Sequence, residues 1–310
     1  MPAQKAIPTR PFGRTGVEVS ILGLGGWHLG VPKTTREAVR LAQAAIDAGI
    51  TFLDNAWDYN DGVSEERMGK AIAGRRDQVF LMTKVCTHGR DGRTAMRQLE
   101  DSLRRLRTDY LDLWQIHEVV YEGEPASCFA RGGPVEALDR ARRQGKVRFV
   151  GFTGHKDPRL HLEMLAYDYP FDACQLPLNP FDASFRSFEQ HVLPELERRG
   201  IAAIGMKSLG GDGRAVKAGV LTAEEALAYA LSLPVATVVS GIDSEKVLRQ
   251  NLRVAQGFRP LSARRRDALR RRVSGVATDG RFELYKITAV FEGNEGRRQH
   301  GLPLQEELGG

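Results

Sequence analysis

Apolar and polar positions along the chain follow two alternating patterns. Residues 34–49 begin with a capping box formed by Thr34 and Glu37, carry apolar residues on one face and end at Gly49, which predicts a helix. The apolar segment 50–54 follows directly and predicts a buried strand. This alternation of strand and helix continues to about residue 252.

Eight strand segments can be read from this pattern, and each is too apolar to leave either face in water. They are residues 21–26, 50–54, 78–85, 110–116, 147–154, 172–178, 201–207 and 235–241. Helical segments lie between them, including 65–74, 135–145, 157–168, 187–200, 222–233, 244–252 and a stripe formed by Met96, Leu99, Leu103 and Leu106. Eight such units predict an α/β protein with a closed parallel (β/α)8 TIM barrel. A doubly wound open sheet would also alternate, but the glycines of LGLGGWHLG lack the dinucleotide-binding spacing.

Segments at both ends of the chain extend this single domain of residues 1–310. Residues 8–20 predict an N-terminal hairpin that could plug the bottom of the barrel, with its turn at Thr15 and Gly16. Residues 277–310 form a C-terminal tail that is either packed on the barrel or disordered. Its aromatic residues Phe282, Tyr285 and Phe291 favour packing.

Composition limits the classes of function. With 42% hydrophobic and 27% charged residues, and without a long apolar run, the chain is expected to be soluble, cytoplasmic and without a membrane span. Cys86, Cys128 and Cys174 lie far apart, so we expect buried free thiols and neither disulfides nor a metal site. The net charge of +6 fits acidic small molecules as well as nucleic acid. The basic run 263–272 has no interleaved aromatics, so we expect a solvated helix face and no nucleic-acid partner.

Polar residues at the ends of predicted strands are the candidates for chemistry, because these ends meet at one mouth of a barrel. Asp54 ends the second strand, Tyr59 lies in the loop after it, Lys84 ends the third strand and His117 ends the fourth. Each also has a purely structural interpretation: a turn cap, a rim aromatic, a lysine reaching solvent and a core histidine, respectively. Their convergence on neighbouring strands favours a shared site.

Together these four residues could form a site that donates a proton to a carbonyl group, with Tyr59 as the donor and the other three as its supports. A tyrosine has an ordinary pKa of about 10, and the ammonium of Lys84 is expected to lower the pKa of Tyr59. Asp54 would hold Lys84 charged and oriented, and His117 could hydrogen-bond the substrate oxygen. Hydride would then have to come from a cofactor.

Four motifs in this order resemble the aldo-keto reductase family: FGRTGVEVS, DNAWDY followed by Ser64 and Glu65, MTKV, and RTDYLDLWQIH. The resemblance covers nearly the whole chain. It implies a barrel with an N-terminal hairpin, NADP(H)-dependent carbonyl reduction, and a catalytic tetrad at Asp54, Tyr59, Lys84 and His117 with Tyr59 as the proton donor.

The resemblance also implies cofactor contacts, with two departures from the family pattern. Gly154 stands where the family often has an asparagine, and Met206 stands where it has a ring-stacking tyrosine. A thioether can still pack on the nicotinamide. The implied cofactor-binding positions are Gly26, Trp27, Asp54, Thr153, Gly154, Gln175, Met206, Lys207, Ser208, Leu209, Gly241, Ser244, Lys246, Gln250 and Asn251.

The choice between NADP and NAD depends on the segment 240–252, which resembles the part of the family that holds the adenosine phosphate. Lys246 and Arg249 are the cations expected within reach of a 2′-phosphate, whereas Asp243 would repel one if it pointed inward. We expect NADPH to be preferred weakly and NAD to be possible. An ordinary helix N-cap at Asp243 or Ser244 is the structural alternative.

The expected partner is a small carbonyl substrate. Trp27, Trp57 and His117 are expected to line its pocket, and the loop 118–133 is expected to face it, although the two tryptophans could instead pack under the tail. The alternative function is a non-catalytic cofactor-binding scaffold or regulatory subunit on the same fold, against which the complete tetrad argues. The sequence leaves the substrate and the oligomeric state open.

Overall fold

Eight parallel strands close into a barrel in the computed structural model, which describes residues 6–87 and 90–308. Their order around the barrel is β10-β3-β4-β5-β6-β7-β8-β9, so consecutive strands are neighbours and the last pairs with the first. This arrangement confirms the predicted TIM barrel, and each predicted strand segment contains one of its strands. The strands are β3 (Leu22–Gly25), β4 (Phe52–Asp54), β5 (Phe80–Val85), β6 (Leu111–Ile116), β7 (Val147–Thr153), β8 (Ala173–Pro177), β9 (Ala202–Met206) and β10 (Thr237–Gly241).

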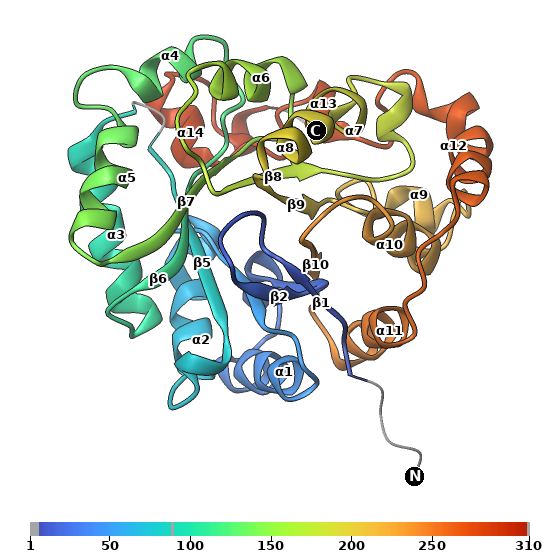
Figure 1. Cartoon of the computed structure of the whole chain (residues 1–310), viewed down its shortest axis with the longest axis horizontal. Coiled ribbons are helices and arrows are strands. Elements are labelled where there is room, and N and C mark those ends of the chain that lie inside the picture. Colours follow the sequence, from blue (N-terminus) through green and yellow to red (C-terminus); the bar gives the residue numbers. More distant parts are fainter. Residues whose placement is uncertain (1–5, 88–89, 309–310) are drawn as a thin grey trace.

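Helices surround the strands, as Figure 1 shows. The first of them begins at the predicted capping box, where the Thr34 side chain accepts from Glu37 N at 3.2 Å and the Glu37 carboxylate accepts from Thr34 N at 3.1 Å. The helices around the barrel are α1 (Thr35–Asp47), α2 (Val63–Ala71), α3 (Gly92–Leu106), α4 (Glu124–Phe129), α5 (Pro134–Arg143), α6 (Pro158–Ala166), α7 (Phe188–His191), α8 (Leu193–Arg199), α9 (Arg214–Lys217), α10 (Ala223–Leu231) and α11 (Glu245–Gln256). Short 3-10 turns are η1 (Gly26–Gly30), η2 (Tyr59–Gly62), η3 (Arg76–Gln78), η4 (Asp182–Ser184) and η5 (Gln305–Glu307).

Two predictions about the helices were incomplete. The predicted helix 187–200 is divided into α7 and α8, because Pro194 in the first turn of α8 has no N–H to continue the ladder. The loop 118–133 contains α4, which begins after Gly123 in a left-handed conformation.

The N-terminal hairpin is the predicted plug of the barrel bottom. Its strands β1 (Thr9–Pro11) and β2 (Glu18–Ser20) pair antiparallel, and Figure 1 shows this dark-blue pair in front of the barrel strands. Between them Phe12 is fully buried, with its ring 4.7 Å from that of Phe80 and 6.0 Å from that of Phe52. Both partners lie at the start of a barrel strand, so the aromatic cluster closes the end of the barrel opposite the strand termini.

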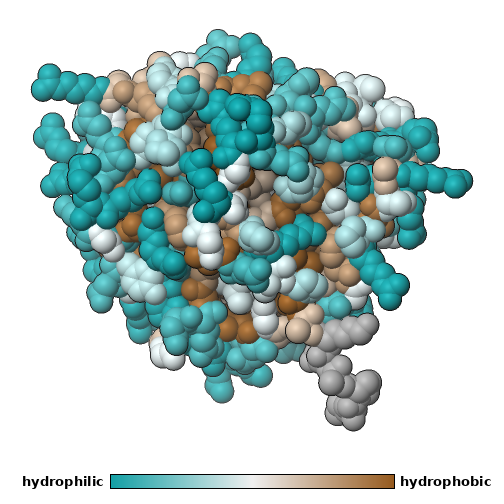
Figure 2. Space-filling view, in the orientation of Figure 1, coloured by the Kyte–Doolittle hydropathy of each residue, from teal (hydrophilic) through white to brown (hydrophobic). Residues whose placement is uncertain are grey.

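The barrel interior and the layer between strands and helices form two separate apolar cores. The inner one contains Phe12, Phe52, Phe80, Met82, Leu113, Ala173 and Ile204. The outer one is larger and packs the backs of the strands against the helices. On the face shown in Figure 2, hydrophilic side chains form most of the outline and apolar residues show in small groups between them.

The C-terminal tail is packed on the barrel, as its aromatics predicted, over the described residues 277–308. It follows α12 (Ala263–Ala277) and contains α13 (Leu284–Ile287) and α14 (Asn294–Gln299). Lys286 is fully buried, and its ammonium lies 2.7 Å from Asp182 and 3.0 Å from Glu283. Because Asp182 follows β8, this buried ion cluster ties the tail to the mouth of the barrel.

The basic run on α12 is partly engaged with the rest of the protein. Arg270 forms an ion pair with Glu189, and Arg272 lies 2.7 Å from Glu225. At least these two arginines therefore belong to the contacts that hold α12 on the barrel.

Candidate active site at the barrel mouth

Alternation along the strands places the predicted residues inside the mouth. Side chains two apart on a strand point to the same side. On β4 the inward Phe52 is followed by Asp54, and on β5 the inward Met82 is followed by Lys84. The same spacing on β6 leads from Leu113 through Gln115 to His117, just past the strand end.

Lys84 is the centre of the site. Its buried ammonium donates to Asp54 Oδ1 at 2.5 Å, to the carbonyl of Asn55 at 2.8 Å and to Tyr59 Oη at 3.3 Å. Asp54 Oδ1 also accepts from Gln175 Nε2, at 3.3 Å, from β8. All three protons of the ammonium therefore have acceptors, and the lysine is held in one orientation.

Tyr59 begins η2, in the loop after β4, and its ring lies against Lys84 and His117. The pKa of Tyr59 lies well above its ordinary value, because the side chain is buried and the carboxylates of Asp54, Asp58 and Glu118 disfavour a phenolate. This corrects the expectation from the sequence that Lys84 would lower that pKa. The phenol is consequently protonated at neutral pH.

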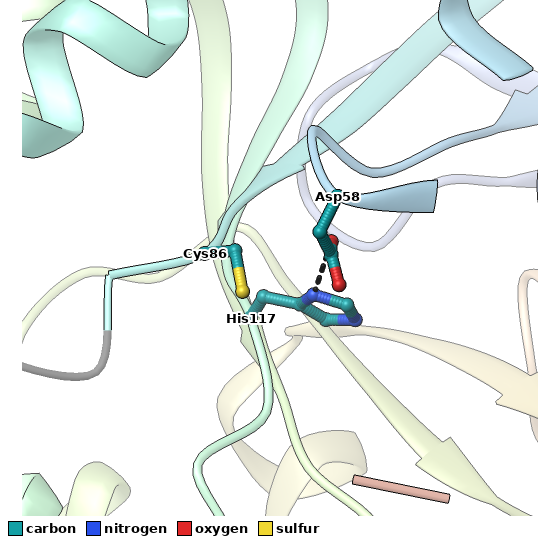
Figure 3. A group of neighbouring side chains, drawn as sticks. All are labelled: Asp58, Cys86 and His117. Atoms are coloured by element: carbon teal, nitrogen blue, oxygen red, sulfur yellow. Dashed lines mark ion pairs between the residues drawn. The ribbon is translucent and has the colours of Figure 1, made fainter. Parts of the chain in front are cut away.

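His117 lies beside Tyr59, with the two rings 5.6 Å apart in an edge-to-face arrangement. Its Nδ1 is 3.2 Å from Asp58 Oδ1, and this contact lowers the pKa of Asp58 although burial opposes the shift. Figure 3 shows the Nδ1 edge of the ring turned toward Asp58 and the other ring nitrogen on the far side. Asp58 thus orients the imidazole and leaves Nε2 for another partner.

Two carboxylates at this site escaped the sequence reasoning. Asp58 directly precedes Tyr59, and Glu118 directly follows His117, so their positions next to predicted site residues were the available signal. Glu118 is buried and adopts a left-handed φ of 47°, which is rare for a residue with a side chain. Its carboxylate accepts from the backbone N–H of Gly293 at 3.1 Å, which brings the tail over the mouth.

Lys207 places a second ammonium near the mouth, one residue past β9 and also with a left-handed φ, 54°. Its Nζ lies 4.7 Å from the ring of Phe291 and 5.3 Å from that of Tyr285, both in the tail. Burial lowers the pKa of Lys207 to about 8, with Lys84 contributing in the same direction. Within residues 6–87 and 90–308, no hydrogen bond or ion pair of this ammonium is found.

Several predicted cofactor-binding positions lie around this group. Thr153 and Gln175 are buried neighbours on β7 and β8, and Gln175 Oε1 is buried without a hydrogen-bond partner among the described residues. Gly154 is required by its surroundings, because a Cβ there would lie 2.3 Å from the carbonyl oxygen of Val119. That close approach explains why the family's asparagine is absent at this position.

The remaining predicted cofactor positions extend from the mouth toward α11. Met206 ends β9 and is followed by Ser208, which is buried, and Leu209, which is partly exposed. Gly241 ends β10, and a Cβ there would overlap the ring of His28, which the sequence reasoning did not single out. A Cβ on Gly26 would likewise lie too close to β4, at 2.4 Å from the carbonyl oxygen of Asp54.

The start of α11 forms one side of a groove against α1, with a volume of about 490 Å³. Ser244 is the N-cap of α11, as the structural alternative had it, and also lines the groove. The charged lining consists of Glu37, Asp47, Asp243, Glu245 and the cation Arg40. Sequence reasoning missed Arg40.

Other predicted residues of α11 lie outside this groove. Lys246 is exposed, and Arg249 is exposed and paired with Glu245 at 3.1 Å. Asn251 is buried and donates to Ser240 Oγ at 2.9 Å, and Gln250 is partly exposed. These positions do not form one cluster with the groove lining.

The two tryptophans that were predicted to line the pocket lie against other parts of the protein. Trp57 faces α3, where its Nε1 donates to Asp101 at 3.4 Å and its ring lies 5.3 Å from the guanidinium of Arg105. Trp27, in η1, is 50% exposed and packs edge-on against His28. The structure therefore does not bring Trp57 into the group around Tyr59.

A separate observation concerns membranes. Among the described residues, none of the helices is long and apolar enough to cross a bilayer.

Comparison with known proteins gives consistent matches over the barrel. The model of the aldo/keto reductase family matches residues 21–219. The chain is 34% identical over 197 residues to the aldo-keto reductase YhdN of Bacillus subtilis, covering 58% of this chain and 55% of that protein. It is 38% identical over 138 residues to the methylglyoxal reductase YeaE of Escherichia coli, covering 44% and 46%. The chain thus spans about half the length of these curated relatives.

Solved structures extend the likeness to most of the chain. A thermostable aldo-keto reductase in complex with the inhibitor epalrestat is 28% identical, with a TM-score of 0.72. The match covers 86% of this chain and 100% of that one. The match to the family model ends before α10, so α10 to α12 and the tail over the mouth lie outside it.

Proposed function

The chain belongs to the aldo/keto reductase family, and from this premise we propose that it reduces the carbonyl group of a small aldehyde, ketone or sugar with a nicotinamide cofactor. Tyr59 is the proton donor in this proposal. The observation that carries it is the hydrogen bond from Lys84 Nζ to Tyr59 Oη at 3.3 Å. Because the phenolic oxygen accepts from Lys84, its own proton is left to point toward a substrate.

The raised pKa of Tyr59 is compatible with this role. A phenol that stays protonated at neutral pH is always ready to donate. The acceptor is an oxygen that becomes an alkoxide, which is a far stronger base than a phenolate. Lys84 then stabilises the phenolate that remains, and Asp54 holds the lysine in place.

His117 positions the substrate oxygen in this mechanism. Asp58 holds the Nδ1 edge of the ring, so Nε2 is directed to the other side. With a proton on both ring nitrogens, Nδ1 donates to Asp58 and Nε2 can donate to the carbonyl oxygen. The substrate oxygen would thus lie between Tyr59 Oη and His117 Nε2. Asp58 acts through His117 and is a positioning residue.

The residues around the mouth fit a nicotinamide cofactor, which supplies the hydride when bound. Gln175 Oε1 is buried and lacks a partner among the described residues, so it can accept from a carboxamide. Thr153 adjoins it on β7 and offers a hydroxyl. Lys207 offers a cation that no described carboxylate neutralises by contact, which suits a phosphate group.

The coenzyme preference in this proposal is small and favours NADPH. The groove beside Ser244 carries Arg40 as its cation, whereas Lys246 and Arg249 lie outside the lining. One charge-assisted contact contributes about 1.5–3 kcal/mol, or about ten- to a hundredfold in affinity. Asp243 and Glu245 on the same groove reduce this gain, so both coenzymes are expected to work.

The substrate class in this proposal rests on the polarity of the mouth and on one relative. YeaE is named a methylglyoxal reductase, and methylglyoxal is a small carbonyl compound. Asp58 and Glu118 add acceptors near Tyr59 that suit hydroxyl groups, as in a sugar or a hydroxyaldehyde. The tail borders these residues, since the backbone N–H of Gly293 donates to Glu118.

A panel of small aldehydes, ketones and sugars, assayed with NADPH and with NADH, tests this function. The proposal predicts cofactor oxidation with at least one member of the panel and a higher catalytic efficiency with NADPH. Tight cofactor binding without turnover of any compound would contradict it and favour the non-catalytic scaffold.

A further inference from the structure

We propose that a thiophilic divalent cation of the zinc class binds between Asp58, Cys86 and His117 at the barrel mouth and inhibits the enzyme. Figure 3 shows the three side chains as neighbours, with Asp58 at the Nδ1 edge of the imidazole and the Cys86 sulfur beside His117. Binding of the ion is independent of the proposed function, whereas the inhibition rests on it.

The three ligands come from neighbouring elements of the barrel. Cys86 follows β5, His117 follows β6, and Asp58 lies in the loop after β4. One ligand atom from each, the Sγ, a ring nitrogen and a carboxylate oxygen, all lie within 4.8 Å of one another. Sequence spacing could not reveal this site, because the residues are about thirty positions apart and meet only when the strands pair.

The separations suit a tetrahedral ion. Nitrogen and oxygen ligands at about 2.0–2.1 Å from zinc, at the tetrahedral angle, are about 3.3 Å apart. The observed distance from His117 Nδ1 to Asp58 Oδ1 is 3.2 Å. A thiolate in the third position leaves the fourth for water or another small ligand.

The contact between His117 and Asp58 gives a second indication, because the two atoms form an ion pair without hydrogen-bond geometry. His117 is only 5% exposed, yet its Nδ1 has no hydrogen-bond partner among residues 6–87 and 90–308, and the same holds for Asp58 Oδ1. Buried polar atoms are normally hydrogen-bonded, so this pair calls for an explanation. The ion pair alone accounts for their closeness, but an ion between them also accounts for the adjacent sulfur and the poor hydrogen-bond geometry.

Ligand chemistry selects the kind of ion. One thiolate, one imidazole and one carboxylate favour zinc or cobalt over magnesium and calcium, which prefer oxygen ligands. On binding, the Cys86 thiol gives up its proton to solvent, and the charges of the thiolate and Asp58 balance the divalent cation. No redox step is involved.

Inhibition follows from the position of the site. With the ion bound, Nδ1 would contact the ion and no longer Asp58 directly, so the ion would set the orientation of the ring beside Tyr59 and with it the position of Nε2, which is proposed to bind the substrate oxygen. The tail lies directly over this position, since a Cβ on Gly293 would be 3.2 Å from Asp58 Oδ2. Entry of the ion would require this tail segment to move aside.

Cobalt titration of the full-length protein tests binding without reference to activity. The unmutated protein is expected to take up one Co²⁺ with an intense tetrahedral visible spectrum and a thiolate-to-cobalt band in the near ultraviolet. Cys86→Ala should lose the near-ultraviolet band and bind at least about tenfold more weakly. Cys174→Ala is the matched control, because Cys174 is also a fully buried free thiol but lies on β8, and it should behave like the unmutated protein.

Two results would overturn the site: no tight cobalt binding by the unmutated protein, or an unchanged spectrum in Cys86→Ala. If Cys86→Ala fails to fold, Asp58→Asn gives the same test through an expected loss of affinity of at least about tenfold. Zinc inhibition of reductase activity is then measured for the unmutated protein, Cys174→Ala and Cys86→Ala. Inhibition of the first two only is expected; binding without inhibition contradicts the regulatory role and leaves the site standing.

Discussion

Replacing Lys84 by methionine removes the ammonium at the centre of the site while keeping a side chain of similar length. Asp54, which is 3% exposed, then loses its partner at 2.5 Å and keeps the hydrogen bond from the side-chain amide of Gln175 at 3.3 Å. Removing one member of a buried ion pair costs about 3–5 kcal/mol, because a charge is left buried without compensation. Compared with a total stability of about 5–15 kcal/mol, this loss is large but leaves a folded protein to measure.

Urea unfolding of three variants separates the free-energy cost of the unpaired Asp54 charge from a general loss of stability caused by the substitution. Lys84→Met should lose about 3–5 kcal/mol, and Lys84→Met with Asp54→Asn should regain most of it, because no unpaired charge remains. Lys146→Met is the matched control: it makes the same substitution in a surface pair with Glu100 and should cost less than about 1 kcal/mol.

Turnover should respond differently from stability. Both variants that lack Lys84 should reduce carbonyls at least about a hundredfold more slowly, because Tyr59 loses the group that orients it and stabilises its phenolate. An unfolding free energy of Lys84→Met equal to that of the unmutated protein would refute the buried pair. Unchanged turnover would remove Lys84 from the mechanism.

Three further predictions concern charges around the mouth. Cofactor affinity, measured by fluorescence titration, should fall as the pH rises through about 8, because Lys207 loses its proton there. The affinity of Lys207→Arg should not change over this pH range. A pH-independent affinity of the unmutated protein would contradict a role of Lys207 in binding the cofactor. Lys286→Met should lower the unfolding free energy by about 3–5 kcal/mol, because Asp182 and Glu283 stay buried without their cation, and an unchanged urea midpoint would refute the anchor. Arg40→Ala should raise KM for NADPH more than for NADH, and equal effects on both would place the adenosine phosphate elsewhere.

The parts of this molecule that follow from strand periodicity could be predicted from the sequence. Because side chains alternate along a strand, Asp54 and Lys84 face inward at the mouth like Phe52 and Met82, which lie two residues before them. The start of α1 could likewise be predicted, because the capping box involves only neighbouring residues. The aromatic residues of the tail predicted that it packs on the protein.

Loop conformation could not be predicted in the same way. Glu118 and Lys207 take left-handed backbone angles that only the surrounding contacts stabilise, and these angles decide where the side chains point. The direction of Trp57 depends on its contacts with α3, more than forty residues away. The pKa of Tyr59 is raised first by burial and then by Asp54, Asp58 and Glu118, and the burial of its side chain depends on how these loops pack.

The outward orientation of Lys246 and Arg249 on α11, by contrast, can be predicted from the sequence. Leu248, Asn251 and Leu252 form its buried stripe, so Lys246 and Arg249 had to lie on its outer face. The cation of the groove comes from α1 instead, which only the packing of the two helices could reveal.

Turnover of the Tyr59→Phe variant tests the central claim most directly, because this change removes one oxygen and leaves the ring in contact with His117. Single-turnover reduction of an active carbonyl compound, with cofactor affinity measured in parallel, separates chemistry from binding. The account predicts a rate about a hundred- to ten-thousand-fold lower with cofactor affinity unchanged. A variant that retained more than about a tenth of the rate of the unmutated protein would contradict the assignment of Tyr59 as the proton donor.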